Sequence, residues 1–564
     1  MNNWKKRRAE IPPFNPDSSV PWIIQDLLAL RGYADAQEWE VFFAPKLSQL
    51  KSPWLLADMS LSVDRLEVAF RRQEPICLYA DFDLDGTSAL ALALQAFREL
   101  GFKKLLSLQP QRLTDGYGFH PHLVEDVAAK GARLIVTMDV GITSHEAAQK
   151  ARELAVDVII TDHHQPENVL PEALAVVNPN RRDCNSGLGY LCGAGVMFYL
   201  LRALKRRLVE KALVAENSLN LRSLLDLLTV ATLTDMVPLI EDNRLLVKHG
   251  LQVLSETARP GLRALLEKLK LSGRILTGQD VAFRFAPKLN ALSRLESGLR
   301  PLDLYMAETM EDAENIVDDV LDRNAERVEL QARGEEIAMA IFSTQADCPC
   351  VFVTSTEFHR GVVGLIATKM ANQTGRPAFV GAESADGVVV GSARAPQGKC
   401  VDVLRALKTA ADFFTRFGGH GPAAGFEFRR ENASAIALAL ASHFAGADEQ
   451  SEMEIEYDLD LSLEFVTANL IQWINSLGPY GTQFPLPLFC FRELRVESVK
   501  ILKGNHLKLG VVHKNLARTV TALYFSPPPD LNLAAGMTID VLGELQKNDF
   551  RRVIEPQILI RDLR

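Results

Sequence analysis

Three aspartates at alternate positions directly after a short apolar run constrain the fold of this chain more than any other feature. Residues 76–80 are apolar and indicate a buried strand, and an apolar stretch over 88–100 predicts a helix. Between them stand Asp81, Asp83 and Asp85, followed by Gly86. Carboxylates that converge just past a strand end repel one another unless a cation neutralises them. We therefore expect a divalent metal site here.

An EF-hand calcium loop is excluded by the same residues. Such a loop follows a helix and carries a glutamate at its twelfth position. Counting from Asp81, that position is Leu92, and a strand precedes Asp81. For this stretch taken alone, a solvated turn rich in aspartate is the alternative.

The composition is that of a soluble protein with several domains. The chain has 564 residues, of which 47% are hydrophobic and 24% charged. No apolar run approaches the ~18–20 residues of a membrane span, and no apolar signal core follows the basic residues 5–8. The seven cysteines show no disulfide or zinc spacing. We expect a cytoplasmic protein that is not bound to a membrane. The net charge of −9 still permits a local basic channel.

Strand and helix patterns alternate between residues 75 and 180. Strands are predicted at 76–80, 104–108, 133–138, 157–161 and 174–177, and helices at 88–100, 121–130 and 144–155. This alternation predicts a parallel sheet covered by helices, in which ligands bind at the carboxyl ends of the strands. Asp139 follows the third of these strands and Asp162-His163-His164 follows the fourth. Asp235 ends a later helical stretch before Pro238.

Taken singly, each of these residues has a structural alternative, because an aspartate after a strand is often a helix cap. Together they predict a metal centre. Oxygen and imidazole donors without a thiol pattern favour Mn²⁺ or Mg²⁺ over structural zinc. The candidate ligands outnumber the needs of one octahedral ion. Two ions ~3.5–4 Å apart would suit phosphoryl transfer.

The second half of the chain predicts a connector, a second α/β lobe and a barrel. Residues 302–345 are charged and helical, and strand–helix alternation resumes at 351–354. Loops at 359–364 and 418–425, and Arg394 after a valine-rich strand, could contact phosphates, although tight turns explain the loops equally well. No Gly-x4-Gly-Lys-Ser/Thr loop is present, which argues against an ATP-driven motor.

Residues 453–560 are rich in strand patterns and predict a small Greek-key barrel. Within 491–520, seven basic residues stand against two acids, and four aromatic residues lie in or beside this window. These are Arg492, Arg495, Lys500, Lys503, Lys508, Lys514 and Arg518, with Phe489, Phe491, Tyr524 and Phe525. Basic and aromatic residues hold single strands without reading sequence. The alternative is that the aromatics form barrel core and the lysines a solvated face.

The motifs resemble, in order, those of the DHH phosphoesterase family. They are Asp81-x-Asp83-x-Asp85-Gly86, Asp115-Gly116-Tyr117-Gly118, Asp139-Val140-Gly141, Asp162-His163-His164 and Asp235. The resemblance covers nearly the whole chain and is closest to the single-strand-specific DNA exonucleases of the family. Thr234-Asp235 and residues 478–485 depart from the usual pattern, which has Ala-Asp and Gly-Asn-Pro there. Pyrophosphatase relatives have a metal-binding histidine where this chain has Tyr79, and Asp81 would compensate for its loss.

The resemblance implies the roles of individual residues. The implied metal ligands are Asp81, Asp83, Asp85, Asp139, Asp162, His163 and Asp235. Asp139 would bridge two ions, and His164 would lie beside the scissile phosphate, so that His164, Asp139 and Asp81 form the catalytic set. The implied contacts to substrate phosphates are Arg112, Arg294, His359, Ser392, Arg394, Gly419 and His420.

It also implies a domain order and a function. The order is an N-terminal helical segment (1–50), a catalytic domain (51–300), connecting helices (301–345), a substrate-binding α/β domain (346–450) and an OB-like barrel (451–564). The implied function is a metal-dependent 5′-to-3′ exonuclease. It would degrade single-stranded DNA to 5′-mononucleotides by metal-activated water, in recombination and repair. A monomer and a single-strand-binding protein partner are expected from the resemblance alone.

Two other functions remain open at this point. A DHH phosphodiesterase for short oligonucleotides or cyclic dinucleotides would keep the metal chemistry, but such relatives lack the C-terminal barrel. A catalytically silent DNA-binding scaffold would have lost motif acids that are present here.

Overall fold

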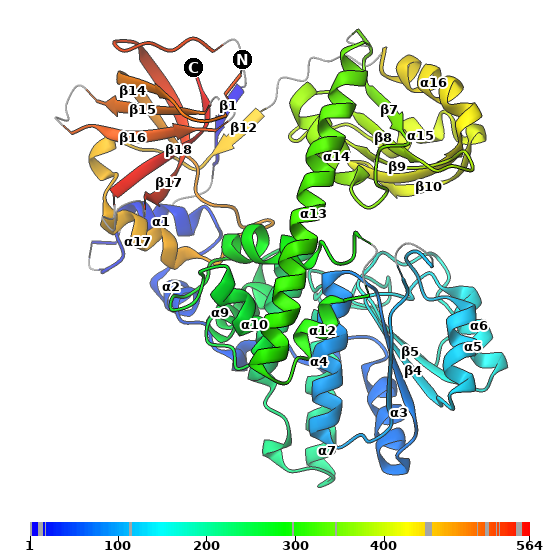
Figure 1. Ribbon diagram of the computed structural model, residues 1–564. Coiled ribbons are helices and arrows are strands. Elements are labelled where there is room, and N and C mark those ends of the chain that lie inside the picture. Colours follow the sequence, from blue (N-terminus) through cyan, green and yellow to red (C-terminus); the bar gives the residue numbers. More distant parts are fainter. Residues whose placement is uncertain are drawn as a thin grey trace. The chain divides into compact units, whose positions relative to one another are not determined.

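The protein is described by a computed structural model in two compact units (Figure 1). Unit 1 comprises Met1–Ala258, Leu269–Arg284 and Glu454–Arg564, and unit 2 comprises Arg259–Lys268 and Phe285–Met453. Within the described residues, no helix has the length and apolarity to span a membrane. The described residues are 3–8, 15–16, 18–111, 115–295, 298–344, 347–445, 454–504, 506–513, 518–525, 527–528, 531–548 and 555–564.

A five-stranded parallel sheet forms the centre of unit 1, as the alternating pattern predicted. Its order is β3 (Leu105–Leu108), β2 (Ile76–Ala80), β4 (Leu134–Met138), β5 (Asp157–Thr161) and β6 (Ala175–Val177). Every residue of β2 and β4 is buried, because helices cover both faces of the sheet. The parallel arrangement brings the carboxyl ends of β2, β4 and β5 to one edge.

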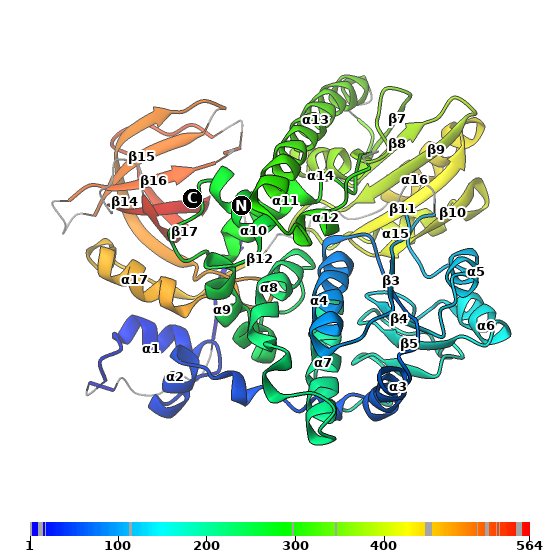
Figure 2. The ribbon, with the colours of Figure 1, turned by 60° about the horizontal axis from the view of Figure 1, so that its bottom comes forward.

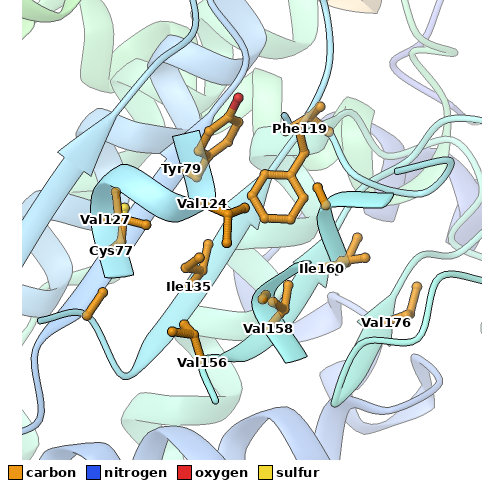
Figure 3. Close-up of a cluster of buried hydrophobic side chains, with 14 of the residues drawn as sticks. Cys77, Tyr79, Phe119, Val124, Val127, Ile135, Val156, Val158, Ile160 and Val176 are labelled. Atoms are coloured by element: carbon orange, nitrogen blue, oxygen red, sulfur yellow. The ribbon is translucent and has the colours of Figure 1, made fainter. Parts of the chain in front are cut away.

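One face of this sheet packs against α5 (Pro121–Ala129) and α6 (His145–Glu153) (Figure 2). Figure 3 shows how Val124 of α5 lies over Ile135 of β4 and close to Tyr79 of β2. The other face packs against three longer helices, α3 (Met59–Arg72), α4 (Leu84–Leu100) and α7 (Gly193–Glu210). Helix α4 begins at Leu84 rather than near residue 88. Its first turn is capped by the side chain of Asp83, which accepts hydrogen bonds from the backbone N–H groups of Asp85 and Gly86.

Further helices complete this part of unit 1. They are α1 (Trp22–Ala29), α2 (Ala36–Phe43), α8 (Leu225–Thr234) and α9 (Glu241–Ser255). Helix α8 packs against α4 and ends immediately before Asp235, which is its C-cap residue. Because α8 packs against α4, Asp235 at the end of α8 lies near the start of α4.

Unit 2 contains the long connecting helix and a mixed sheet. Helix α13 (Met310–Ser343) follows α10 (Pro260–Lys268), α11 (Ala286–Leu289) and α12 (Pro301–Tyr305). The sheet order is β10 (Phe414–His420), β11 (Ala423–Arg429), β9 (Val388–Arg394), β8 (Ala378–Glu383) and β7 (Val351–Ser355). Helices α13 and α14 (Val363–Thr374) pack on one face, and α15 (Val403–Lys408) and α16 (Ala433–Ala445) on the other.

The C-terminal part of unit 1 is a closed five-stranded barrel, which confirms the predicted barrel. Its strands are β14 (Phe489–Ile501), β15 (Leu507–Val512), β16 (Val520–Tyr524), β18 (Glu555–Leu563) and β17 (Thr538–Asn548), and β17 pairs back with β14. Closure leaves no open edge among these strands. The short β12 (Glu454–Tyr457), β13 (Leu459–Asp460) and α17 (Ala468–Leu477) precede the barrel.

The segment 1–50, predicted to be helical, contains α1 and α2 but begins with a strand in the described residues. Strand β1 (Asn3–Lys6) pairs in parallel with β12. Trp4 is buried against Tyr457, Cys490 and Leu542, and its indole N–H donates to Asp562 Oδ2 at 2.7 Å. A strand of four residues with one buried side chain carries too little periodicity to be recognised in the sequence.

Candidate metal centre

The ends of three neighbouring strands and two helix ends bring acids and imidazoles to one place in unit 1. Asp81 follows β2, Asp139 follows β4, and Asp162-His163-His164 follow β5. Asp83 and Asp85 stand at the start of α4, and Asp235 at the end of α8. Asp139 adopts a left-handed conformation (φ 61°), which turns the chain sharply after the strand.

His163 lies at the centre of this group. Its Nε2 atom is 3.1 Å from Asp139 Oδ1, 3.6 Å from Asp235 Oδ2 and 3.8 Å from Asp85 Oδ2. Three overlapping sets of donor atoms lie close enough together to hold an ion. They are Asp81, Asp83 and Asp139; Asp85, His163 and Asp235; and Asp139, His163 and His164.

These donors fit a divalent cation because several of them are buried without a hydrogen-bond partner. Asp81 Oδ1, Asp139 Oδ1, His163 Nε2 and Asp235 Oδ2 are buried and accept or donate no hydrogen bond within the described chain. Leaving a buried polar atom unsatisfied costs roughly 1–3 kcal/mol, and more for a charged group. Asp139 belongs to two of the donor sets, as a residue shared between two ions would.

Burial and mutual repulsion oppose ionisation of these carboxyl groups. Burial, and then the charge of Asp83, raises the pKa of Asp81 to about 7. Burial together with Asp85 and Asp83 raises the pKa of Asp235 to about 9. The pKa of Asp139 is raised well above its usual value by burial and by the acids around it. A cation bound among these carboxyl groups favours their ionised forms and lowers their pKa values.

Backbone groups from α7 support the site, and sequence reasoning missed them. The N–H groups of Gly193 and Ala194 donate to the Asp85 carboxylate at 2.6 and 2.9 Å. Negative charge is favoured at the start of a helix, where such N–H groups have no helical partner. A Cβ atom on Gly193 would lie only 2.7 Å from Asp139 Oδ1 and 2.8 Å from Asp139 Cα. Glycine is therefore required where α7 meets the metal centre.

Asp162 does not group with the other donors, in contrast to its expected role as a ligand. Its Oδ2 accepts the N–H of Ile142 at 2.9 Å, and its Oδ1 accepts the N–H of His163 and Nδ1–H of His164, both at 2.7 Å. Both oxygens are thus occupied within the protein. Burial alone would raise the pKa of Asp162, but the hydrogen bond and charge of His164 lower it. The geometry indicates that Asp162 orients the imidazole of His164.

His164 is held by this pairing. Burial alone would lower the pKa of His164, but the hydrogen bond to Asp162 and its charge raise the pKa to about 9. Because Nδ1 is occupied, Nε2 is the ring nitrogen available to a ligand. His164 also lines a cavity of about 440 Å³ with Asp81, Asp83, Asp139 and Asp235.

Tyr117 is a second group that sequence reasoning did not assign to the site. Its hydroxyl lies 3.3 Å from His164 Nδ1 and 3.4 Å from the backbone oxygen of Asp139, and its half-exposed ring lines the same cavity. The signal was the sequence Asp115-Gly116-Tyr117-Gly118, in which Gly116 and Gly118 have positive φ. That turn carries the tyrosine over the cavity.

We expect Tyr117→Phe to slow turnover about 2- to 10-fold without changing the fold, since one neutral hydrogen bond contributes about 0.5–1.5 kcal/mol. Tyr117→Ala should cost more, because it also removes the aromatic surface. Steady-state rates on the expected substrate, single-stranded DNA, check this, with Tyr190→Phe as a control hydroxyl outside the cavity. Equal rates for wild type and Tyr117→Phe would show that the hydroxyl has no part in turnover.

The raised carboxyl pKa values predict how the metal-free protein responds to pH. A carboxyl group with a raised pKa in the folded state stabilises that state at low pH, and this contribution is lost as pH rises through the folded pKa. With pKa values of about 7 for Asp81 and about 9 for Asp235, the metal-free protein in chelator should lose stability between about pH 5 and pH 9. We expect a fall in Tm of about 5 °C or more over this range.

Saturating Mn²⁺ should remove most of that fall, because bound cations keep the carboxylates ionised. Thermal unfolding with and without chelator across this pH range measures both effects. If the Tm of the protein in chelator stayed constant from pH 5 to 9, the raised pKa values of the buried carboxyl groups would be contradicted.

The expected phosphate contacts that the structure describes all lie in unit 2. Arg394 Nη1 donates to Ser392 Oγ at 2.6 Å, and Arg394 Nη2 would lie 3.2 Å from a Cβ placed on Gly364 near the start of α14. His359 Nδ1 accepts the N–H of Gly361 at 3.1 Å. Arg394, Ser392 and Gly364 thus form one compact group beside the first turn of a helix. Such a turn is suited to an anion.

The remaining predicted contacts are less closely grouped. Arg294 Nη1 is 3.4 Å from the Gly361 carbonyl oxygen, which places Arg294 against the loop that carries His359. Gly419 and His420 are exposed at the tip of the β10–β11 hairpin, where Gly419 has φ 142°. The small-residue stretch 418–425 is thus a tight hairpin, one of the two readings expected for it. Arg112 lies outside the described residues.

The basic and aromatic residues predicted to contact DNA in the barrel divide into buried and exposed side chains. Phe489, Phe491 and Tyr524 are buried, so they cannot stack on bases, and Phe525 is half-exposed. Arg492 pairs with Asp540 at 3.0 Å, and Arg518 donates to the Val466 carbonyl oxygen at 2.6 Å. Other basic residues of the window remain exposed, and Lys514 lies outside the described residues. The exposed ones are Arg495, Lys500, Lys503 and Lys508.

A larger cavity, of about 1100 Å³, lies elsewhere in unit 1. Trp39, Phe43, Ile275 and Trp473 contribute to its mostly apolar lining, and none of the grouped carboxylates does. The smaller, polar cavity is lined by carboxylates that could bind a metal ion. We therefore take the smaller cavity, and not the larger one, as the candidate site.

Comparisons with known proteins agree with this geometry. Residues 75–232 match the DHH family N-terminal domain, residues 348–446 the DHHA1 domain, and residues 457–562 the RecJ OB domain. The single-stranded-DNA-specific exonuclease RecJ of Escherichia coli is 32% identical over 561 residues, which cover 97% of this chain and 96% of the relative.

Two solved structures are similar over almost the whole chain. RecJ of Thermus thermophilus in complex with Mn²⁺ has a TM-score of 0.80 at 28% identity, covering 96% of this chain and 75% of that one. The same protein in complex with Mg²⁺ has a TM-score of 0.73 at 26% identity, covering 96% and 74%.

Proposed function

The chain belongs to the RecJ family of single-stranded-DNA-specific exonucleases, and from this premise we propose that it removes 5′-mononucleotides from the 5′ end of single-stranded DNA by hydrolysis. Family membership establishes the coarser statement, a metal-dependent exonuclease specific for single strands. Direction, product and the use of two ions are the finer parts of the proposal. The alternative of a phosphodiesterase for short oligonucleotides is disfavoured by the C-terminal barrel, and that of a silent scaffold by the complete set of acids.

One observation carries the proposal. Four buried ligand atoms, Asp81 Oδ1, Asp139 Oδ1, His163 Nε2 and Asp235 Oδ2, converge without a hydrogen-bond partner in the described chain. Around them, the proposed ligands are Asp81, Asp83, Asp85, Asp139, His163 and Asp235. Bound divalent ions supply an activated water and neutralise charge on the phosphoryl group.

The protein's own groups then orient and bind. Gly193 and Ala194 hold the Asp85 carboxylate, and Asp162 holds the imidazole of His164. With Nδ1 occupied, His164 presents Nε2 to an oxygen of the scissile phosphate. In unit 2, Arg394 with Ser392 is the proposed contact for a substrate phosphate, because a guanidinium binds phosphate through two parallel N–H groups.

Digestion of one labelled strand tests the proposal. A single-stranded DNA labelled separately at each end is incubated with Mn²⁺ or Mg²⁺, and the same strand is tested as a blunt duplex. Early release of mononucleotide from the 5′ label, with the duplex intact, is the expected result. Release first from the 3′ label would reverse the direction. Survival of long DNA while dinucleotides are cut would replace the function by that of an oligonucleotide phosphodiesterase.

A cytoplasmic, monomeric enzyme that meets its substrate on a single-strand-binding protein completes the proposal. Mass measurement of the protein in solution tests the monomer, and binding of a purified single-strand-binding protein tests the partner.

A further inference from the structure

The backbone turns in a left-handed conformation at Asp139, the residue that belongs to two donor sets. Its φ is 61°, and that of Gly141, two residues later, is 119°. A residue with a Cβ atom adopts such a conformation at a cost in free energy, and keeps it only where surrounding contacts fix the backbone. The contacts that hold this turn therefore set the position of the Asp139 carboxylate.

Thr137, the fourth residue of β4, makes one of these contacts. Its hydroxyl donates to the Val140 carbonyl oxygen at 2.7 Å, and so closes a loop across Met138 and Asp139. A Cβ atom on Gly141 would lie 3.0 Å from the Thr137 hydroxyl oxygen, which places this hydroxyl against the end of the turn. The hydrogen bond thus spans the left-handed residue from one side to the other.

A second threonine holds the same segment from the neighbouring strand. The hydroxyl of Thr161, at the end of β5, donates to the Thr137 carbonyl oxygen at 2.6 Å. The Asp139 N–H donates to the Thr161 carbonyl oxygen at 3.0 Å. Both threonines are fully buried. The turn at Asp139 is therefore tied to β5, and the chain that leaves β5 carries His163 into the metal centre.

Thr137 is the only polar residue of β4, whose sequence is Leu-Ile-Val-Thr-Met. Its partners across the sheet are Tyr79 of β2 and Ile160 of β5. Together with Ile135 they belong to a buried apolar cluster (Figure 3). Valine has the same shape as threonine and would suit such a place better, because burial of a hydroxyl is unfavourable unless it is hydrogen-bonded. A threonine at this position therefore indicates that the hydroxyl is used.

We propose that Thr137 is a positioning residue of the metal centre, and that its hydroxyl fixes the left-handed turn which directs the Asp139 carboxylate towards the other ligands. The inference rests on the proposed function, because it assigns Thr137 to the metal centre on which that function depends. Thr137 acts through the backbone of Asp139 and supplies no ligand atom itself. Loss of a group that orients a metal ligand typically lowers metal affinity or activity about 10- to 100-fold.

Two substitutions at Thr137 separate the hydroxyl from the methyl group. Thr137→Val keeps the shape of the side chain and removes the hydrogen bond, whereas Thr137→Ser keeps the hydroxyl and removes the methyl group. Thr137→Val should bind Mn²⁺ about 10-fold more weakly than wild type. Thr137→Ser should keep the Mn²⁺ affinity of wild type and have a lower Tm, because a buried methyl group is lost.

Binding of Mn²⁺ to the whole protein in the absence of DNA tests the assignment. The free ion is measured by its electron paramagnetic resonance signal during titration, and the Tm is measured in chelator and at one fixed Mn²⁺ concentration. Thr137→Val should gain less Tm from Mn²⁺ than wild type does, because a ligand stabilises the folded state in proportion to its affinity. The Mn²⁺ concentration that gives half of the maximal exonuclease rate should rise by the same factor as the dissociation constant.

Thr257→Val is the matched control. The Thr257 hydroxyl is also buried and donates to Asp226 Oδ2 at 2.7 Å, and neither residue belongs to the three donor sets. This variant should have a lower Tm and the Mn²⁺ affinity of wild type.

A Thr137→Val variant that behaved like this control would show that Thr137 has only a structural role, which overturns the inference. Equal losses of Mn²⁺ affinity in Thr137→Val and Thr137→Ser would overturn it as well, since Thr137→Ser retains the hydroxyl. If wild type itself bound no Mn²⁺, the metal centre of the proposed function would be refuted together with the inference. Wild type that binds Mn²⁺ and degrades single strands, beside a Thr137→Val variant of equal affinity, would refute the inference alone.

Discussion

Asp139→Asn is expected to reduce turnover by about a thousandfold or more while making the metal-free protein more stable. The side chain keeps its shape, but the charge that Asp85, Asp83 and Asp235 repel is gone. A buried acid with a raised pKa destabilises the folded state at neutral pH, so its neutral replacement should raise the Tm in chelator. The variant replaces the carboxylate of the residue that belongs to two donor sets by a neutral amide, a much weaker metal ligand, and should lose the metal centre.

The measurements are the exonuclease rate and the Tm, each with Mn²⁺ and with chelator. Wild type should gain Tm on addition of Mn²⁺, and Asp139→Asn should gain much less. Asp126→Asn, which removes an exposed acid from α5, controls for charge and should behave as wild type. An unaltered rate for Asp139→Asn would refute the metal assignment, and a lower Tm in chelator would show that Asp139 has a structural role instead.

Gly193→Ala is expected to lower activity about a hundredfold through a single added methyl group. Its Cβ would lie 2.7 Å from Asp139 Oδ1, so either Asp139 or the first turn of α7 must move. Movement of that turn also withdraws the two N–H groups from Asp85. Overpacking of this kind costs about 1–3 kcal/mol, although alanine is the better helix former.

Gly195→Ala, two residues along the same helix, is the matched control. Its Cβ would lie 3.2 Å from Leu191 Cβ, which requires a far smaller shift than the 2.8 Å approach of an alanine Cβ at position 193 to the Cα atom of Asp139. Rates, Mn²⁺ affinity and Tm should separate the two variants. If both alanine variants lost the same activity, the effect would belong to α7 in general and not to its contact with the metal centre.

Much of unit 1 could be predicted because its strands are short, fully apolar and followed by acids. The strands expected at 133–138 and 157–161 differ from β4 and β5 by no more than one residue. Parallel strands share one carboxyl edge, so the sequence alone could place Asp81, Asp139 and His163 near one another.

What could not be predicted depends on contacts that are distant in sequence. Gly193 supports Asp85 through its backbone N–H, which leaves no trace in a pattern of side chains. The difference between Asp162, which orients His164, and Asp139, whose Oδ1 has no partner, depends on which way each carboxylate turns after its strand. Buried Phe489 and Phe491 could be assigned to the core only once the barrel had fixed the inward face of β14.

The pairing of β1 with β12 also fixes a sequence of events during synthesis on the ribosome. Residues 3–6 are translated about 450 residues before their partner strand, residues 454–457. Trp4 needs in addition Leu542 and Asp562, which are later still. The metal-centre sheet, whose contacts are local by comparison, can form long before then. Strand β1 therefore lacks its partner strand during most of translation, and the barrel is the last part of unit 1 to be completed.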